Sequence, residues 1–196
     1  MEKLVVDGID LSNLVGIRYD ASRHPGSVRI DEFLKNPQLG SNCQLLVLGA
    51  LEKAGFYIGS QIKMDQGERF GSQELWTDKI YTKLLLSVTE RPIGILNIDA
   101  ALYRISLEGC AHEFFNIFFF WPPGWNPLSL PYDYKKMHIG VSVGLIKEEG
   151  SDPFILHNAK PGPSNLWTLK DFVANKYFPF GVKRALIKSS YKLSPR

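Results

Sequence analysis

The chain has 196 residues, of which 44% are hydrophobic and 22% are charged, and its formal net charge is +3. These values are typical of one globular domain with a substantial core, and a small net charge from scattered basic residues argues against a nucleic-acid partner. Two cysteines are too few for a disulfide framework, and no cysteine–histidine pair has the spacing of a zinc site, so we expect no metal and no cofactor.

The N-terminus lacks the basic start and the apolar run of a secretory signal. The longest apolar run, Phe114 to Pro123, is interrupted by Asn116 and is too short to span a bilayer. As written, the sequence predicts a cytoplasmic protein with no membrane span, and it leaves open export by a non-classical route or as a toxin. It gives no indication of oligomeric state.

The first part of the chain is predicted to be helical. Leu11 to Val15 can form a helical turn, Arg29 to Asn36 a short amphipathic helix that Pro37 stops, and Ser72 to Asp78 another turn. Strands are predicted mainly in the second part, within Thr82–Val88, Ile93–Ile105, His112–Trp121, Met137–Leu145, Pro153–Asn158 and Gly181–Ile187.

One more short helix is predicted late in the chain, over Thr168 to Asn175. Thr168 can cap it, and Leu169, Phe172 and Val173 are expected to face inward. Helices that precede a run of strands favour an α+β fold, with N-terminal helices packed on a central antiparallel sheet, over alternating βαβ units.

Cys43 is expected to open a buried helix that Gly55 can end. Ser41 or Asn42 can cap its first turn. At that position the thiol meets free backbone N–H groups and the positive end of the helix dipole. Both favour the thiolate, which is the nucleophilic form of cysteine.

Two histidines lie on neighbouring predicted strands, His138 on the first and His157 on the second. In an antiparallel hairpin, paired residue numbers sum to a constant. An odd sum places both histidines on one face, and a sum of 295 places them directly opposite each other, whereas an even sum separates them. In the productive register His138 is the candidate base for Cys43, and His157 orients its imidazole as the third member of a triad. Asn158 is a rival for that third role, but on a regular strand it faces the other side.

Other chemistry-bearing residues have less support. The Pro-rich loop from Trp121 to Trp125 either walls a cleft or simply packs. Cys110 and His112 share a strand face, but nothing there supplies a helix N-terminus, so we expect packing rather than a second dyad. His24, in a polar loop, is expected to face solvent.

The order of these parts resembles the NlpC-type cell-wall cysteine peptidases. In that family a cysteine opens a buried helix, a His-x-Gly-x-x-x-Gly strand supplies the base and the next strand supplies a third polar residue. A tyrosine in a Gly-x-x-Tyr segment lies upstream of the cysteine. The matching segments here are Asn42-Cys43-Gln44-Leu45-Leu46-Val47, His138-Ile139-Gly140-Val141-Ser142-Val143-Gly144, Phe154-Ile155-Leu156-His157-Asn158-Ala159 and Gly16-Ile17-Arg18-Tyr19.

The resemblance implies a single papain-like domain over residues 1–196, with an insertion within 82–137. It implies a cysteine-dependent amide hydrolase acting on a peptide or a peptidoglycan fragment, with Cys43, His138 and His157 as catalytic residues. Residues expected near the oxyanion or the substrate are Tyr19, Asn42, Trp121 and Trp125.

Two alternatives remain at this point. A catalytically silent module on the same fold could bind a peptide or glycan through the Trp121–Trp125 loop. The insertion motivates it, as do Asn42 and Gln44, which flank the thiol where the family usually has Asp and Ser. A thiol acyltransferase or deamidase would use the same residues, and only its products would distinguish it from a hydrolase.

Overall fold

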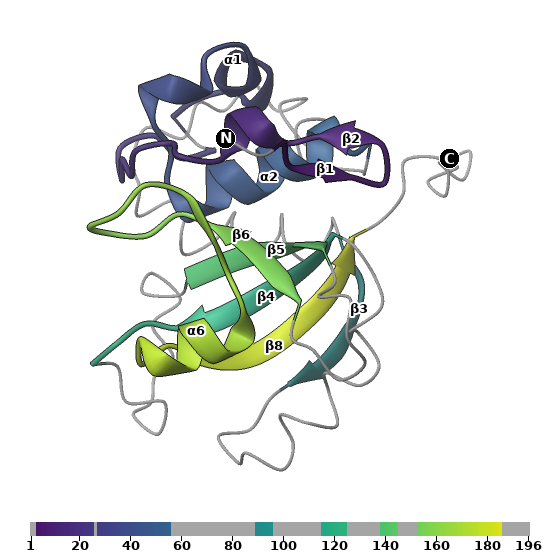
Figure 1. Ribbon diagram of the computed structural model, residues 1–196, viewed down its shortest axis with the longest axis vertical. Coiled ribbons are helices and arrows are strands. Elements are labelled where there is room, and N and C mark those ends of the chain that lie inside the picture. The colour runs from purple at the N-terminus through teal and green to yellow at the C-terminus, as the bar shows by residue number, and fades with distance from the viewer. Residues whose placement is uncertain are drawn as a thin grey trace, which may run out of the picture.

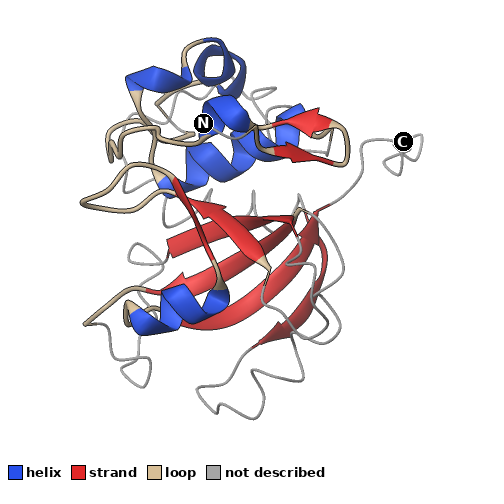
Figure 2. Cartoon of the chain, viewed as in Figure 1, coloured by secondary structure: helices blue, strands red, loops and turns tan. Residues whose placement is uncertain are grey.

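The computed structural model describes residues 3–25, 27–55, 89–95, 115–124, 138–144 and 153–185, and only the backbone of 89–95 and 178–185. Within them the chain has an α+β architecture, with helices beside an antiparallel sheet (Figures 1 and 2). Predictions for Ser72–Asp78, Thr82–Val88, Cys110, His112 and Trp125 lie outside the described residues.

The described part of the central sheet has six strands in the order β3-β8-β4-β5-β6-β7, and all neighbours are antiparallel. The last described strand, β8, therefore lies inside the sheet, between β3 and β4. The strands are β3 (Thr89–Ile95), β4 (Asn116–Trp121), β5 (His138–Gly144), β6 (Phe154–His157), β7 (Asn165–Trp167) and β8 (Phe178–Ala185).

The N-terminal region consists of short elements above the sheet (Figure 1). A small hairpin of β1 (Val5–Val6) and β2 (Ile9–Asp10) turns at Asp7-Gly8, both with positive φ, as tight hairpin turns require. The remaining elements are η1 (Ser12–Leu14), α1 (Ile30–Lys35), η2 (Pro37–Leu39) and α2 (Cys43–Lys53). Three of them, η1, α1 and α2, overlap predicted helices, and η2 is an additional turn of helix after α1.

The two faces of the sheet are covered by different helices. Side chains along β4 point alternately to the two faces of the sheet. Ile117 and Phe119 therefore lie in the core shared with α2, and Phe118 and Phe120 lie in a second core with α6 (Leu169–Ala174). Both sets are almost fully buried, so the sheet is apolar on both sides. Helix α6 starts as predicted, at a capping box between Thr168 and Asp171.

Ser164, directly before β7, joins the sheet to the N-terminal segment. Its hydroxyl donates to the carbonyl of Leu14 and accepts from the amide of Ile17, both at 2.7 Å. Its backbone bonds Gly16 and Ile17 at 2.9 and 2.7 Å. Because Ser164 is 2% exposed, these four hydrogen bonds are shielded from water and fix the loop against residues 14–17.

Three details of the sequence prediction are wrong. Val173 is 48% exposed, because only Leu169 and Phe172 of the short α6 reach the sheet. His24 is 5% exposed rather than solvent-facing, and burial lowers its pKa. The three-residue strand β7 was not predicted.

Among the described helices, none has both the length and the apolar character that a membrane span requires.

Gly140 of β5 gives a test of the sheet register. A Cβ there would collide with Cγ2 of Ile155 and lie 3.1 Å from the Leu156 carbonyl oxygen and 3.3 Å from Cβ of His157. We expect Gly140→Ala to lower the free energy of unfolding in urea by about 1–3 kcal/mol, the usual cost of overpacking.

Gly144→Ala on the same strand is the matched control, because nothing lies within 4 Å of its Cβ position. We expect it to change the free energy of unfolding by no more than about 0.5 kcal/mol. Equal effects of the two substitutions would contradict the described pairing of β5 with β6.

Candidate active site

Cys43 is the first residue of α2, as predicted, and Asn42 caps the helix. The Asn42 side-chain oxygen accepts from the amide of Leu45 at 2.8 Å, and its side-chain nitrogen donates to Gln44 at 3.2 Å. The structure thus shows a capping role for Asn42, and its contact with substrate stays a prediction. Capping fixes the first turn of α2 and, with it, the position of the thiol.

Burial dominates the electrostatics of the Cys43 thiol. Backbone amides of Ile139, Gln44 and Cys43 itself act on the sulfur and favour the thiolate, as the helix position predicts. Burial works against them, since the residue is only 8% exposed, and it raises the pKa of Cys43 to about 11. Burial therefore opposes the resting thiolate that the helix position favours.

His138 and His157 lie on the same face of the sheet and contact each other. Residue pairs Gly140–His157 and Val141–Leu156 give a sum of 297, so the register has the odd parity that the productive arrangement needs, shifted by two residues from the directly opposed one. His138 Nε2 lies 3.1 Å from His157 Nδ1. The predicted association of the two rings is confirmed.

Aromatic side chains enclose both imidazoles. Phe172 packs against both, with ring centroids 6.0 Å from His138 and 4.6 Å from His157. Tyr177 packs on His138 at 5.3 Å, and Trp167 packs on His157 at 4.3 Å. This apolar enclosure lowers the pKa of His157 to about 4 and that of His138 well below its ordinary value, so both rings are neutral at pH 7.

The backbone of β5 links the thiol to the histidine pair, but the two lie on different faces of the sheet. His138 is paired with Phe120 and packs against Phe172 on the α6 side, whereas Cys43 and Ile139 belong to the core on the α2 side. One of the three amides that act on the Cys43 sulfur belongs to Ile139, the residue directly after His138. Tyr177, in ring contact with His138, also interacts electrostatically with Cys43. Within the described ranges, no hydrogen bond joins the Cys43 sulfur to the His138 ring, and in unliganded enzymes catalytic hydrogen bonds are often long.

Tyr19 lies close to the thiol as well. It is half-buried, and burial together with the neighbouring Cys43 raises its pKa to about 12, so its hydroxyl is protonated and able to donate. Its backbone forms a parallel bridge with Ser41, and the Lys160 ammonium lies 6.0 Å from its ring centroid. The role of Tyr19 as an oxyanion donor stays a prediction.

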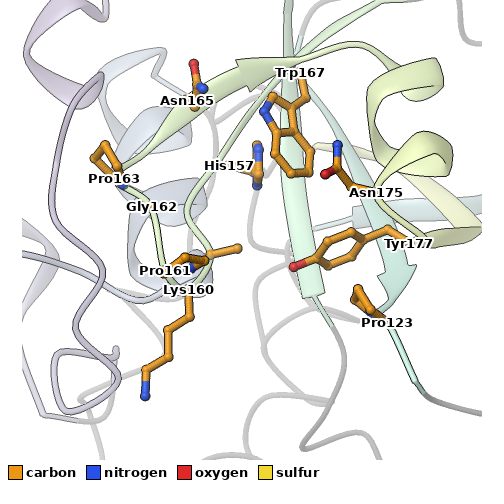
Figure 3. A pocket seen from close by; sticks show the side chains of 11 residues that line it. Pro123, His157, Lys160, Pro161, Gly162, Pro163, Asn165, Trp167, Asn175 and Tyr177 are labelled. Carbon is orange, nitrogen blue, oxygen red and sulfur yellow. The ribbon is translucent and has the colours of Figure 1, made fainter.

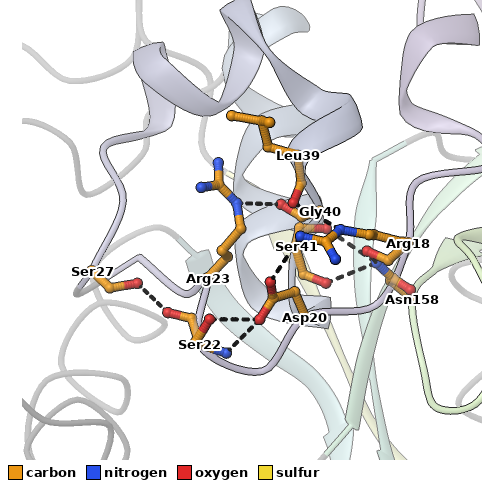
Figure 4. A network of polar contacts seen from close by, with 9 residues as sticks. All are labelled: Arg18, Asp20, Ser22, Arg23, Ser27, Leu39, Gly40, Ser41 and Asn158. Atoms are coloured by element: carbon orange, nitrogen blue, oxygen red, sulfur yellow. Dashed lines mark hydrogen bonds and ion pairs between the residues drawn. The ribbon is translucent and has the colours of Figure 1, made fainter.

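A polar network holds the segment before Cys43 (Figure 4). Asn158, directly after His157, donates its side-chain amide to the backbone carbonyl of Ser41 at 2.9 Å and to its hydroxyl at 3.1 Å. Arg23 donates to the carbonyl of Gly40 at 2.8 Å. The strand that carries His157 is thus tied directly to the approach of α2, and Asn158 points toward Ser41, away from the third position of a triad.

A cavity of about 380 Å³ lies beside His157 (Figure 3). Its walls are apolar and aromatic, with Trp167 and Tyr177 on one side and the loop after β6 on the other, and Lys160 is the charged residue among them. The remaining lining residues are Pro123, Ala159, Pro161, Gly162, Pro163, Asn165 and Asn175.

Trp121 does not belong to a loop. It is the last residue of β4, is 5% exposed and packs in the core beside α2, so its predicted place in a cleft wall is wrong and the packing alternative holds. Trp167 and Tyr177 take the aromatic positions near the histidines, and sequence reasoning missed both. Only Thr168, as a cap between them, indicated that the chain turns back there.

The chemistry of the site is that of a thiol and imidazoles. No cluster of three or more His, Cys, Asp or Glu suited to a metal ion occurs in the part of the chain that the structure describes. Comparison with protein-family models, curated proteins and solved structures found no match. The NlpC-type resemblance therefore rests on the residues that carry it.

The lowered histidine pKa values predict loss of stability in acid. The unfolded chain binds protons near pH 6.5 while the folded chain does not, so this contribution is complete above that pH and is lost as pH falls toward 4. We expect His157→Asn to flatten the slope of unfolding free energy against pH in this window by up to about 1.4 kcal/mol per pH unit.

Chemical denaturation at intervals from pH 7 to pH 4 measures this slope. The buried His24 contributes to it in both proteins, so the comparison uses the difference between variant and wild type. Identical slopes would show that His157 is not kept neutral by the fold.

The pKa of Cys43 predicts how its alkylation depends on pH. In Cys110→Ser protein, which keeps Cys43 as its one thiol, we expect the rate of iodoacetamide reaction to be slow at pH 6–7 and to rise continuously past pH 9. Peptide mass spectrometry locates the modification. A rate that levels off in mild acid would instead reveal a thiolate–imidazolium pair at rest.

Proposed function

We propose that the protein is a cysteine-dependent amide hydrolase with a papain-like, NlpC-type fold. The observation that carries the proposal is the combination of a joined pair of buried imidazoles with a thiol at the start of a capped helix, whose sulfur interacts with the amide of the residue after His138. An inert core cysteine needs no such neighbours. Nucleophile, base and orienting residue come from α2, β5 and β6, in the chain order of the resemblance.

The first step generates the thiolate nucleophile from a neutral Cys43 thiol and a neutral His138 imidazole. His138 uses Nε2 for its contact with His157, which leaves Nδ1 to accept the Cys43 proton. The sulfur attacks the amide carbon as the proton moves to His138, which gives a tetrahedral oxyanion and an imidazolium. His157 steadies that imidazolium through the 3.1 Å contact.

Collapse of the intermediate releases the products. His138 returns the proton to the leaving nitrogen as the carbon–nitrogen bond breaks, and an acyl-thioester remains on Cys43. Water, deprotonated by His138, then hydrolyses the thioester and restores the thiol. The Cys43 amide and the protonated Tyr19 hydroxyl are the proposed oxyanion donors, each worth about 3 kcal/mol in comparable sites.

The substrate class follows from the resemblance and from the cavity. The resemblance indicates an amide in a peptide or peptidoglycan fragment, and an apolar, aromatic cavity beside the base suits such a chain. A hydrolase, an acyltransferase and a deamidase share this first half-reaction, so the fate of the acyl group identifies the reaction.

A silent binding module is the second candidate, and the burial of Cys43 favours it. In that case the cavity beside Trp167 would hold the ligand, since Trp121 is buried in the core. The two candidates differ in whether an acyl group ever reaches the sulfur.

Acyl transfer to Cys43 is the decisive test. We expect peptidoglycan-derived peptides to be cleaved by the wild type and by Cys110→Ser, and not by Cys43→Ala, as followed by liquid chromatography and mass spectrometry. With p-nitrophenyl acetate, an acetyl group should accumulate on Cys43 in the same two active proteins.

Circular dichroism of Cys43→Ala checks that the fold is kept, because the change removes one sulfur from a core position. Cleavage by a folded Cys43→Ala protein, or acetylation spread evenly over both thiols of the wild type, would refute the catalytic proposal in favour of the silent module.

A further inference from the structure

His157 has a second nitrogen that the proposed triad does not use. Its Nδ1 contacts His138, whereas its Nε2 is buried and has no hydrogen-bond partner in the described ranges. The residue is 2% exposed, and its ring lines the cavity beside Trp167 and Tyr177 (Figure 3). A buried polar atom without a partner is costly unless a ligand completes its bonding.

The proton positions in the imidazole pair follow from the proposed function, on which this inference rests. For His138 to accept a proton at Nδ1, its own hydrogen must reside on Nε2 and point to His157 Nδ1. Nδ1 of His157 is then the acceptor. The single hydrogen of the neutral His157 ring is left on Nε2, the buried nitrogen without a partner, in a ring that lines the cavity.

The lining of the cavity selects the kind of acceptor. It contains Lys160 and no Asp or Glu, so it favours a negative charge over a positive one. Lys160 extends away from His157 in Figure 3, and its ammonium lies 6.0 Å from the centroid of the Tyr19 ring, so its charge favours anions in the cavity without pairing directly beside His157. A carboxylate satisfies both features, because it is an anion that only accepts hydrogen bonds.

We propose that this cavity is a carboxylate-binding subsite in which His157 donates its Nε2 hydrogen to a carboxylate of the substrate. The carboxylate, His157 and His138 then form one chain of hydrogen-bonding groups, which begins in the cavity and ends at the proposed base. A bound carboxylate stabilises positive charge on the imidazole pair, so a substrate that carries it assists proton removal from Cys43.

Nuclear magnetic resonance of ¹⁵N-histidine-labelled protein tests the proposal without turnover. Two-bond ¹H–¹⁵N couplings identify which nitrogen of each ring is protonated, and we expect Nε2–H for both His138 and His157. Sodium acetate should shift the His157 signals saturably. Acetamide, of similar shape but uncharged, should bind about tenfold more weakly, as expected for loss of a charge-assisted hydrogen bond.

Two substitutions separate the roles of the two nitrogens. The Asn amide reaches the Nδ1 position only, so His157→Asn should abolish saturable acetate binding, observed through the signals of His138. The Gln amide reaches the Nε2 position, so His157→Gln should retain acetate binding within about threefold. Lys160→Met should weaken acetate binding several-fold and leave acetamide binding unchanged.

The outcomes distinguish this proposal from the hydrolase proposal. A proton on Nδ1 of His157, no saturable response to acetate at constant ionic strength, or equal acetate binding by both His157 variants would overturn the subsite. Acetate binding by Cys43→Ala equal to that of the wild type is expected. If acetate binds as described and no peptide is cleaved, the subsite stands and the hydrolase proposal fails.

Discussion

The contact of 3.1 Å between His138 Nε2 and His157 Nδ1 joins two rings that burial keeps uncharged, so one nitrogen donates and the other accepts. Phe172 stacks on Phe120 at 3.9 Å and packs against both imidazoles, which prevents either ring from turning out to water. The direction of this one hydrogen bond decides whether His138 can take a proton from the thiol and what His157 presents to the cavity.

Much of this arrangement could be predicted from local sequence. The cap at Asn42, the capping box at Thr168 and the alternation along β5 are short-range patterns, and each element was found where its pattern lies. The parity of the β5–β6 register could not be predicted, because the sequence allows both an odd and an even sum, and only the odd sum brings His138 and His157 to one face. Nor could the exact offset, since it depends on how a turn closes rather than on which residues face inward.

Burial was the quantity that local patterns could not provide. The pKa of a thiol at a helix start depends on which residues of the sheet cover it. For Cys43 these residues include Ile139 of β5, which lies far away in the sequence. Long-range contacts also explain why two residues are buried against expectation. His24 lies in a polar stretch of sequence but is covered in the fold, and Trp121 is predicted to lie in a Pro-rich loop but is the last residue of β4. Long-range contacts, rather than propensity, set the protonation of the site.

The loop that walls the cavity is fastened at both ends to the helical side of the molecule, by Asn158 to Ser41 and by Ser164 to residues 14–17. Its outline therefore depends on positions as many as 150 residues away in the sequence. Variation near the start of the chain could alter which ligands are admitted while the thiol and imidazoles stay untouched. That separation gives the scaffold a route by which selectivity can diverge between descendants without loss of chemistry.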